Sequence, residues 1–210
     1  MMTFDFLGGA LFGLIETGGW VVALQVAMSV LGLAALFWKL WQFRRAGVGR
    51  HRDLEAALAA NDAATWRMAL ARSRSGLAAP VRDAQGSVAR VEAEMAAHIA
   101  GLERGFRLFD TIAQLAPLLG LFGTVLGMIA AFQAMQAAGN ATDPAVLAGG
   151  IWVALLTTAV GLAVGMPASV VLNWFESRVA GERVMANRLI AAVPARRPVS
   201  RESEGLRDAA

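Results

Sequence analysis

Two long apolar segments separated by a single charged residue constrain this chain more than any other feature. Between Leu115 and Asn173 the only charged side chain is Asp143. With its apolar flanks, each segment exceeds the roughly 20 residues that a helix needs to cross a hydrocarbon layer about 30 Å thick. We therefore predict membrane-spanning helices over 111–136 and 147–175, joined by an outer loop over 137–146.

A third apolar segment, 18–43, precedes these two. It ends with Trp38 and Trp41, followed by Arg44 and Arg45, an order typical of a helix that leaves the membrane through its headgroup layer. Hydrophobic residues make up 57% of the chain and charged residues 17%, which is unlike a soluble domain. The predicted fold class is an all-α integral membrane protein with three transmembrane helices and long cytoplasmic helical extensions.

The basic residues predict the orientation of these spans. Lys39 lies near the end of the first span, eleven arginines lie between the first and second spans, and seven more follow the third. Because loops rich in Lys and Arg stay in the cytoplasm, we predict a periplasmic N terminus and a cytoplasmic C terminus. The net charge of +3 thus reflects topology, and the arginines are too dispersed among carboxylates to indicate nucleic-acid binding.

No residue pattern indicates a metal, a cofactor or an enzyme. The chain has no cysteine, and its two histidines, His51 and His98, lack a second histidine at ligand spacing. We expect both histidines to lie on solvated helix faces.

The segments outside the spans carry several further predictions. Residues 1–17 are expected to form a periplasmic interfacial segment, ended by Gly18 and Gly19. Residues 44–110 are expected to form a cytoplasmic helical region, because apolar residues recur there every three or four positions. This region is predicted to contain two helical stretches, 49–72 and 81–109.

The second stretch is expected to continue without interruption into the second span. The resulting rod of more than 50 residues would be about 80 Å long, a length that suggests lateral packing in an oligomer. After the third span we predict a cytoplasmic helix over 176–193 and a disordered tail over 194–210.

Small residues in the second and third spans indicate close helix packing. Gly120, Gly123 and Gly127 belong to one span and Gly161 and Gly165 to the other, and the two GxxxG spacings each place glycines on one helix face. Both spans also contain a proline, and each proline leaves a backbone carbonyl that neighbouring groups or water must satisfy. These prolines are Pro117 and Pro167.

Thr124 and Thr158 are the candidate functional side chains. A threonine in a membrane helix commonly returns its hydroxyl to a carbonyl one turn earlier. Here both threonines lie among glycines on neighbouring spans, so their hydroxyls are also able to face a common narrow lumen. Thr157 lies about 100° around the helix from Thr158 and is expected to point elsewhere.

The run Leu115 to Gly127 (LAPLLGLFGTVLG), together with Ala154 to Pro167 (ALLTTAVGLAVGMP), resembles the ExbB/TolQ/MotA proton-channel family, most closely ExbB. The resemblance implies an inner-membrane homo-oligomer, expected to be a pentamer, that forms a bundle around a central pore. It also implies an ExbD-like or TolR-like single-span partner, a TonB-like protein, and use of the proton motive force to energise outer-membrane transport. Thr124 and Thr158 match the pore-lining threonines of the family.

The chain departs from this family at one position. A glutamate often stands five residues before the second threonine, where this chain has Val153. The proton's exit route is therefore left open, and a partner's intramembrane aspartate is expected to supply the missing acid. TolQ-like and MotA-like stators remain alternatives, although a MotA-like chain is expected to have four spans. A non-conducting scaffold or a permease component is the alternative from another class.

Overall fold

The computed structural model describes residues 2–60, 62–83, 87–138 and 144–193. These residues form helices and turns, without any strand in the described ranges, and divide into two compact units. The membrane unit contains Met1–Lys39 and Gly105–Trp174, and the extramembrane unit contains Leu40–Arg104 and Phe175–Ala210.

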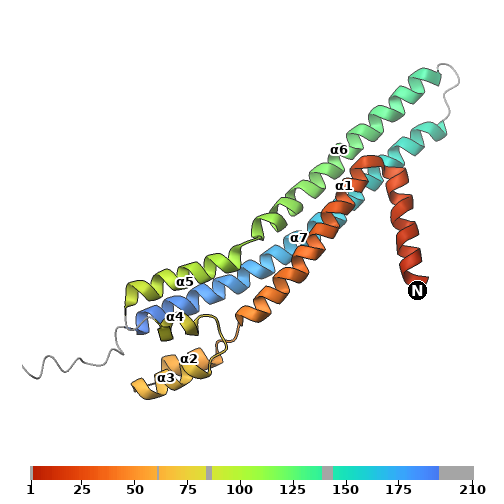
Figure 1. Cartoon of the computed structure of the whole chain (residues 1–210). Helices are drawn as coiled ribbons and strands as arrows, with labels where there is room; N and C mark the ends of the chain where they lie inside the picture. The colour runs from red at the N-terminus through yellow and green to blue at the C-terminus, as the bar shows by residue number, and fades with distance from the viewer. Residues whose placement is uncertain (1, 61, 84–86, 139–143, 194–210) are drawn as a thin grey trace, which may run out of the picture. The chain divides into compact units, whose positions relative to one another are not determined.

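Three helices build the membrane unit (Figure 1): α1 (Met2–Ala46), α6 (Phe106–Ala138) and α7 (Pro144–Ala192). All three contain stretches long and apolar enough to cross a membrane. The prediction of an all-α membrane protein with three apolar spans is thus confirmed. Gly19 interrupts α1 with φ 65°, a conformation that glycine adopts without strain, at the position where the sequence predicted a break.

The membrane unit buries several small side chains between its helices and exposes many large ones. Ala116, Ala131 and Ala154 are buried between its helices. The exposed surface carries large apolar residues that a water-soluble protein would cover. Among the most exposed are Trp20, Phe37, Trp152, Leu155 and Val170.

The extramembrane unit has a conventional apolar core. It contains α2 (Arg52–Ala59), α3 (Ala63–Arg72), α4 (Ala78–Asp83) and α5 (Val88–Glu103), together with the end of α1 and the last part of α7. Figure 1 shows α5 lying alongside that part of α7. Its buried residues include Leu54, Leu70, Leu77, Met95, Ile99, Phe175 and Leu189.

Asp62 begins α3 as a helix cap. One of its carboxylate oxygens accepts a hydrogen bond from the backbone N–H of Thr65 at 2.8 Å, and the other accepts from the Thr65 hydroxyl at 2.7 Å. The backbone hydrogen bond, followed by that of the hydroxyl, lowers the pKa of the Asp62 carboxyl. The cap separates α2 from α3, so the predicted helical stretch 49–72 is two short helices.

The predicted continuous rod over 81–136 is wrong. The helix stops at Glu103, and Gly105 adopts φ 90° before α6 begins. The long uninterrupted helix is α7, whose 49 residues measure about 73 Å along the axis. Helix α7 ends at Ala192, and the predicted tail over 194–210 lies outside the described residues.

The predicted outer loop over 137–146 is shorter than expected. Helix α6 extends to Ala138 and α7 begins at Pro144, so residues at both ends of the predicted loop are helical. Residues 139–143 lie outside the described part of the chain.

Candidate functional site

The contact between α6 and α7 is built on glycines. A Cβ atom added to Gly123 would lie 2.5 Å from the Thr157 hydroxyl oxygen, and one added to Gly161 would lie 2.5 Å from the Ala116 carbonyl oxygen. A Cβ on Gly120 would lie 2.9 Å from the Thr157 carbonyl oxygen. Both distances at Gly120 and Gly161 involve backbone atoms, which side-chain rotation cannot move. The glycines therefore set how closely the two helices approach.

Of the other predicted packing residues, Gly127, Gly165 and Pro117 lie at the contact between α6 and α7. Gly127 faces Ala154, whose nearest atoms lie 3.2 Å from an added Cβ, and the ring of Pro117 lies 2.8 Å from the Cβ position of Gly165. Pro117 is thus part of the tight contact between the helices.

Pro167 is exposed and lies at the edge of a different feature. It lines a cavity of about 260 Å³ whose walls come from α1, α6 and α7 and include Met28, Gly32 and Phe109. This lining is largely apolar, with Ser29 contributing the one hydroxyl. A cavity of this kind provides few partners for water.

Thr157 and Thr158 reach the same carbonyl group. Both hydroxyls donate to the Gly120 carbonyl oxygen at 3.3 Å, and Thr157 also donates to the Ala154 carbonyl oxygen at 2.8 Å. Thr157 is buried and Thr158 is half-buried. We expected the Thr157 and Thr158 side chains to point in different directions; instead, both hydroxyls reach the Gly120 carbonyl oxygen of α6.

Thr124 makes a local bond. Its hydroxyl donates to the Leu121 carbonyl oxygen at 2.7 Å, and its side chain is partly exposed. This is the back-bonded arrangement that threonine commonly adopts in membrane helices. The hydroxyl oxygen still has lone pairs with which to accept a further hydrogen bond.

Gln25 joins all three spans, and sequence reasoning missed it. Its side-chain Nε2 donates to the carbonyl oxygens of Ala116 on α6, at 3.3 Å, and Thr157 on α7, at 3.1 Å. Gln25 is fully buried, and its Oε1 has no hydrogen-bond partner among the described residues. The available signal was a single amide within the apolar run 21–37, and a single residue has no diagnostic spacing.

The polar groups of this site are uncharged. Gln25, Thr157 and Thr158 gather at the glycine contact, while α6 from Thr111 and α7 as far as Phe175 carry no ionisable side chain in their described residues. No group of metal-ligand type was found in the described part of the chain. Amides and hydroxyls are able to hydrogen-bond water or an acid, but they do not bind a proton as a carboxylate does.

The sequence was compared with known families and proteins. The MotA/TolQ/ExbB proton channel family matches residues 62–187. Among similar proteins, the biopolymer transport protein ExbB of Pseudomonas putida is 37% identical over 121 residues, covering 56% of this chain and 36% of that protein. The biopolymer transport protein exbB1 of Vibrio cholerae serotype O1 is 48% identical over 64 residues, covering 30% of this chain and 28% of that protein.

A relative with another role also matches. The Tol-Pal system protein TolQ of Haemophilus influenzae is 38% identical over 101 residues, covering 48% of this chain and 44% of that protein. The chain thus spans less than half the length of each of these relatives.

Proposed function

The chain belongs to the MotA/TolQ/ExbB proton channel family, and from this premise we propose that it is the proton-channel (stator) subunit of an energy-transducing complex. With an ExbD-like or TolR-like partner, it uses the proton motive force to energise TonB-type transport across the outer membrane. The observation that carries the proposal is the uncharged polar site at the α6–α7 contact, where Thr158 and Gln25 lie within an apolar unit.

The missing acid supports a role for a partner. A proton crossing the bilayer needs an ionisable group or a continuous path of water. Because the spans supply hydroxyls and an amide but no carboxylate, and Val153 stands where the family often has glutamate, an aspartate on the partner's single span completes the path. Thr158 and Thr124 then stabilise water or the partner's carboxyl group.

The exposed apolar surface of the membrane unit supports assembly into a homo-oligomer. Leu118 and Leu121 on α6 are 58% and 60% exposed, and Leu155 on α7 is 62% exposed. Lipid and neighbouring subunits are the two environments that accept such a surface. We propose a pentamer whose central pore encloses the partner's helices.

The distribution of arginines supports an inner-membrane topology with the N terminus in the periplasm and the C terminus in the cytoplasm. Because the chain has no cysteine, single cysteines at positions 45, 140 and 178 report on this topology directly. An impermeant thiol reagent added from the periplasm is expected to label position 140 alone. Labelling of position 45 from that side would contradict the topology.

A flux assay tests the function. The full-length chain is reconstituted in vesicles that contain a pH-sensitive dye, alone or with a co-expressed single-span protein that bears an intramembrane aspartate. We expect little proton entry for the chain alone and rapid entry for the pair, which replacement of the partner's aspartate by asparagine abolishes. Rapid, specific entry without the partner would overturn the proposal.

The similarity to TolQ keeps a Tol-Pal-type role as the alternative within the family. The two roles differ in the process that is energised. Restoration of TonB-dependent uptake in a strain lacking ExbB supports the proposed role, whereas restoration of outer-membrane integrity alone, in a strain lacking TolQ, supports the alternative. A scaffold or permease component would restore neither process and would conduct no protons with the partner.

A further inference from the structure

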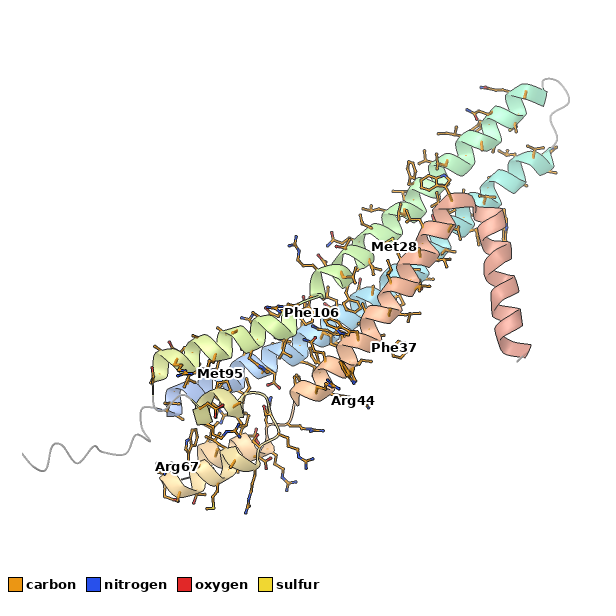
Figure 2. The ribbon with its side chains drawn as sticks, viewed as in Figure 1. Met28, Phe37, Arg44, Arg67, Met95 and Phe106 are labelled. Atoms are coloured by element: carbon orange, nitrogen blue, oxygen red, sulfur yellow. The ribbon has the colours of Figure 1, made fainter. Side chains whose placement is uncertain are left out.

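Exposed arginines gather around the turn that ends α1. Arg44 (Figure 2) and Arg45 occupy its last helical turn, and Arg50 follows within four residues of Ala46. We define the arginine cluster as these residues and four others that the fold brings near them. Its members are Arg44, Arg45, Arg50, Arg52, Arg72, Arg74 and Arg178, and all are exposed.

Backbone contacts bring distant parts of the sequence to this turn. The Gly76 N–H donates to the Ala46 carbonyl oxygen at 3.0 Å, and a Cβ atom on Gly47 would collide with the Arg74 carbonyl oxygen. Gly47 has φ 67°, so both its conformation and its space require glycine. The loop that carries Arg74 is therefore held directly against the end of α1.

Helix α7 contributes the last member of the cluster. The Arg178 Nη1 atom lies 3.4 Å from the Cβ position of Gly49, and the Gly49 N–H donates to a Glu182 carboxylate oxygen at 2.6 Å. Arginines from three separate parts of the chain thus meet within the extramembrane unit.

The nearby carboxylates leave the cluster positive. Glu182 is buried and is already occupied by the Gly49 N–H and by His51, whose Nε2 lies 2.8 Å from it. The exposed carboxylates on the same elements are Asp53, Glu55, Glu176 and the α3 cap Asp62, and they are fewer than the arginines. Among the described residues, Arg44, Arg50, Arg52, Arg72 and Arg74 form no ion pair.

We propose that the arginine cluster binds the anionic headgroups of phospholipids in the leaflet that faces it. Arg44 and Arg178 each follow an apolar span within three residues, which places them beside the headgroup layer. Trp41 is 52% exposed, and its ring centroid lies 3.6 Å from the Arg45 Cζ atom, so the ring stacks on the guanidinium. Tryptophan favours the headgroup layer. Basic clusters directly beside a span attract anionic lipids.

Topology alone does not require this arrangement. Positive residues next to the spans are enough to orient them, yet Arg74 lies more than 25 residues beyond Ala46 in sequence, and the contacts of Gly47 and Gly76 bring its loop back to α1. Arg72 precedes Arg74 by two residues. This proposal does not depend on proton conduction.

The test uses the full-length chain in detergent and native mass spectrometry. The probes are phosphatidylglycerol, phosphatidylcholine with the same acyl chains, and inorganic phosphate. The test variant replaces Arg50, Arg72 and Arg74 with Gln, which keeps Arg44 and Arg45 for topology. The control variant replaces three exposed arginines outside the cluster, Arg67, Arg82 and Arg188, with Gln.

We expect phosphatidylglycerol to bind in preference to phosphatidylcholine, more weakly in high salt, and at least about tenfold more weakly to the test variant than to the control. A variant with Lys at the three test positions keeps the charge and is expected to keep the binding of phosphatidylglycerol. This Lys variant also tests the proposal if the Gln variant fails to fold. Four results would each overturn the proposal. Two concern the ligands: equal binding of both lipids, or binding of inorganic phosphate as strong as that of phosphatidylglycerol. Two concern the variants: an equal loss of phosphatidylglycerol binding in the test and control variants, or a loss of that binding in the Lys variant.

Discussion

The two units of this chain are packed by opposite means. In the membrane unit, α6 and α7 meet through glycines, and the site at their contact is polar, whereas most of the large apolar side chains lie on the exposed surface, with Phe109 and Ile112 among the buried exceptions. In the extramembrane unit, large side chains such as Phe175 and Leu189 fill the interior, and charged residues cover the surface. Helix α7 passes through both arrangements.

This contrast follows from the solvent of each unit. Water drives apolar side chains into the extramembrane core. Lipid provides no such drive, so membrane helices associate through close van der Waals contact and hydrogen bonds, which small residues allow. At the contacts between helices, removing side-chain atoms should therefore damage the extramembrane unit most, and adding them should damage the membrane unit most.

The largest expected effect is that of Phe175→Ala in the extramembrane unit. The Phe175 ring is fully buried and lies 4.9 Å from the Phe43 ring between centroids. Losing it should lower the free energy of unfolding by about 3–5 kcal/mol, measured as a fall in the melting temperature of the detergent-solubilised protein.

Met166→Ala is the matched control on the same helix, because Met166 is 59% exposed in the membrane unit. It should change the melting temperature little. A large fall in the melting temperature of Met166→Ala would contradict the contrast between the two units, since it would mean that a neighbouring subunit covers this face.

The second largest effect is expected for Gly161→Ala in the membrane unit. An added Cβ would meet the Ala116 carbonyl oxygen at 2.5 Å, so the helices must separate, at a cost of about 1–3 kcal/mol. Gly181→Ala, on the same helix but in the extramembrane unit, meets nothing within 4 Å and should stabilise the helix by roughly 0.5–1 kcal/mol.

Thermal unfolding of both variants checks the difference in sign. Equal melting temperatures for Gly161→Ala and Gly181→Ala would mean that close approach does not hold α6 to α7.

The sequence predicted the spans well because their length and apolar character leave no other fold. It did not predict the break at Gly105, because the surrounding apolar periodicity continues across Arg104 and one glycine within a helical pattern does not identify a turn. The GxxxG spacing indicated close packing, but Gln25 had no pattern to mark it. Its role depends on the Ala116 and Thr157 carbonyls, which are 91 and 132 residues away in sequence.

A smaller effect is expected for Gln25→Met. This change keeps the length of the side chain and removes both hydrogen bonds, each worth about 0.6 kcal/mol on average in membrane proteins. It also removes the unpartnered Oε1, which offsets part of the loss. The net change in unfolding free energy should stay below about 1 kcal/mol.

Gln42→Met is the matched change in the extramembrane unit, where the Gln42 Nε2 donates to the Gly101 carbonyl oxygen at 3.2 Å. Gln42 is only partly buried, so we expect a similar or smaller loss there. Thermal unfolding compares the two variants. A loss of several kcal/mol at Gln25 would show that this amide, more than the glycines, holds the three spans together.

The smallest effect on stability, and the one most informative about function, is expected for Thr158→Val and Thr124→Val. Valine keeps the shape and removes the hydroxyl, and the lost bonds to the Gly120 and Leu121 carbonyls should each cost about 0.6 kcal/mol. Thr111→Val is the control, because its hydroxyl donates to the Arg107 carbonyl oxygen at 2.7 Å from an exposed position. Oligomer assembly and partner binding should survive in all three variants, whereas proton entry into vesicles with the partner should fall only for Thr158→Val and Thr124→Val. Full proton entry in both the Thr158→Val and the Thr124→Val variant would assign these hydroxyls to helix packing. The polar site would then have a structural role only, as the extramembrane core has.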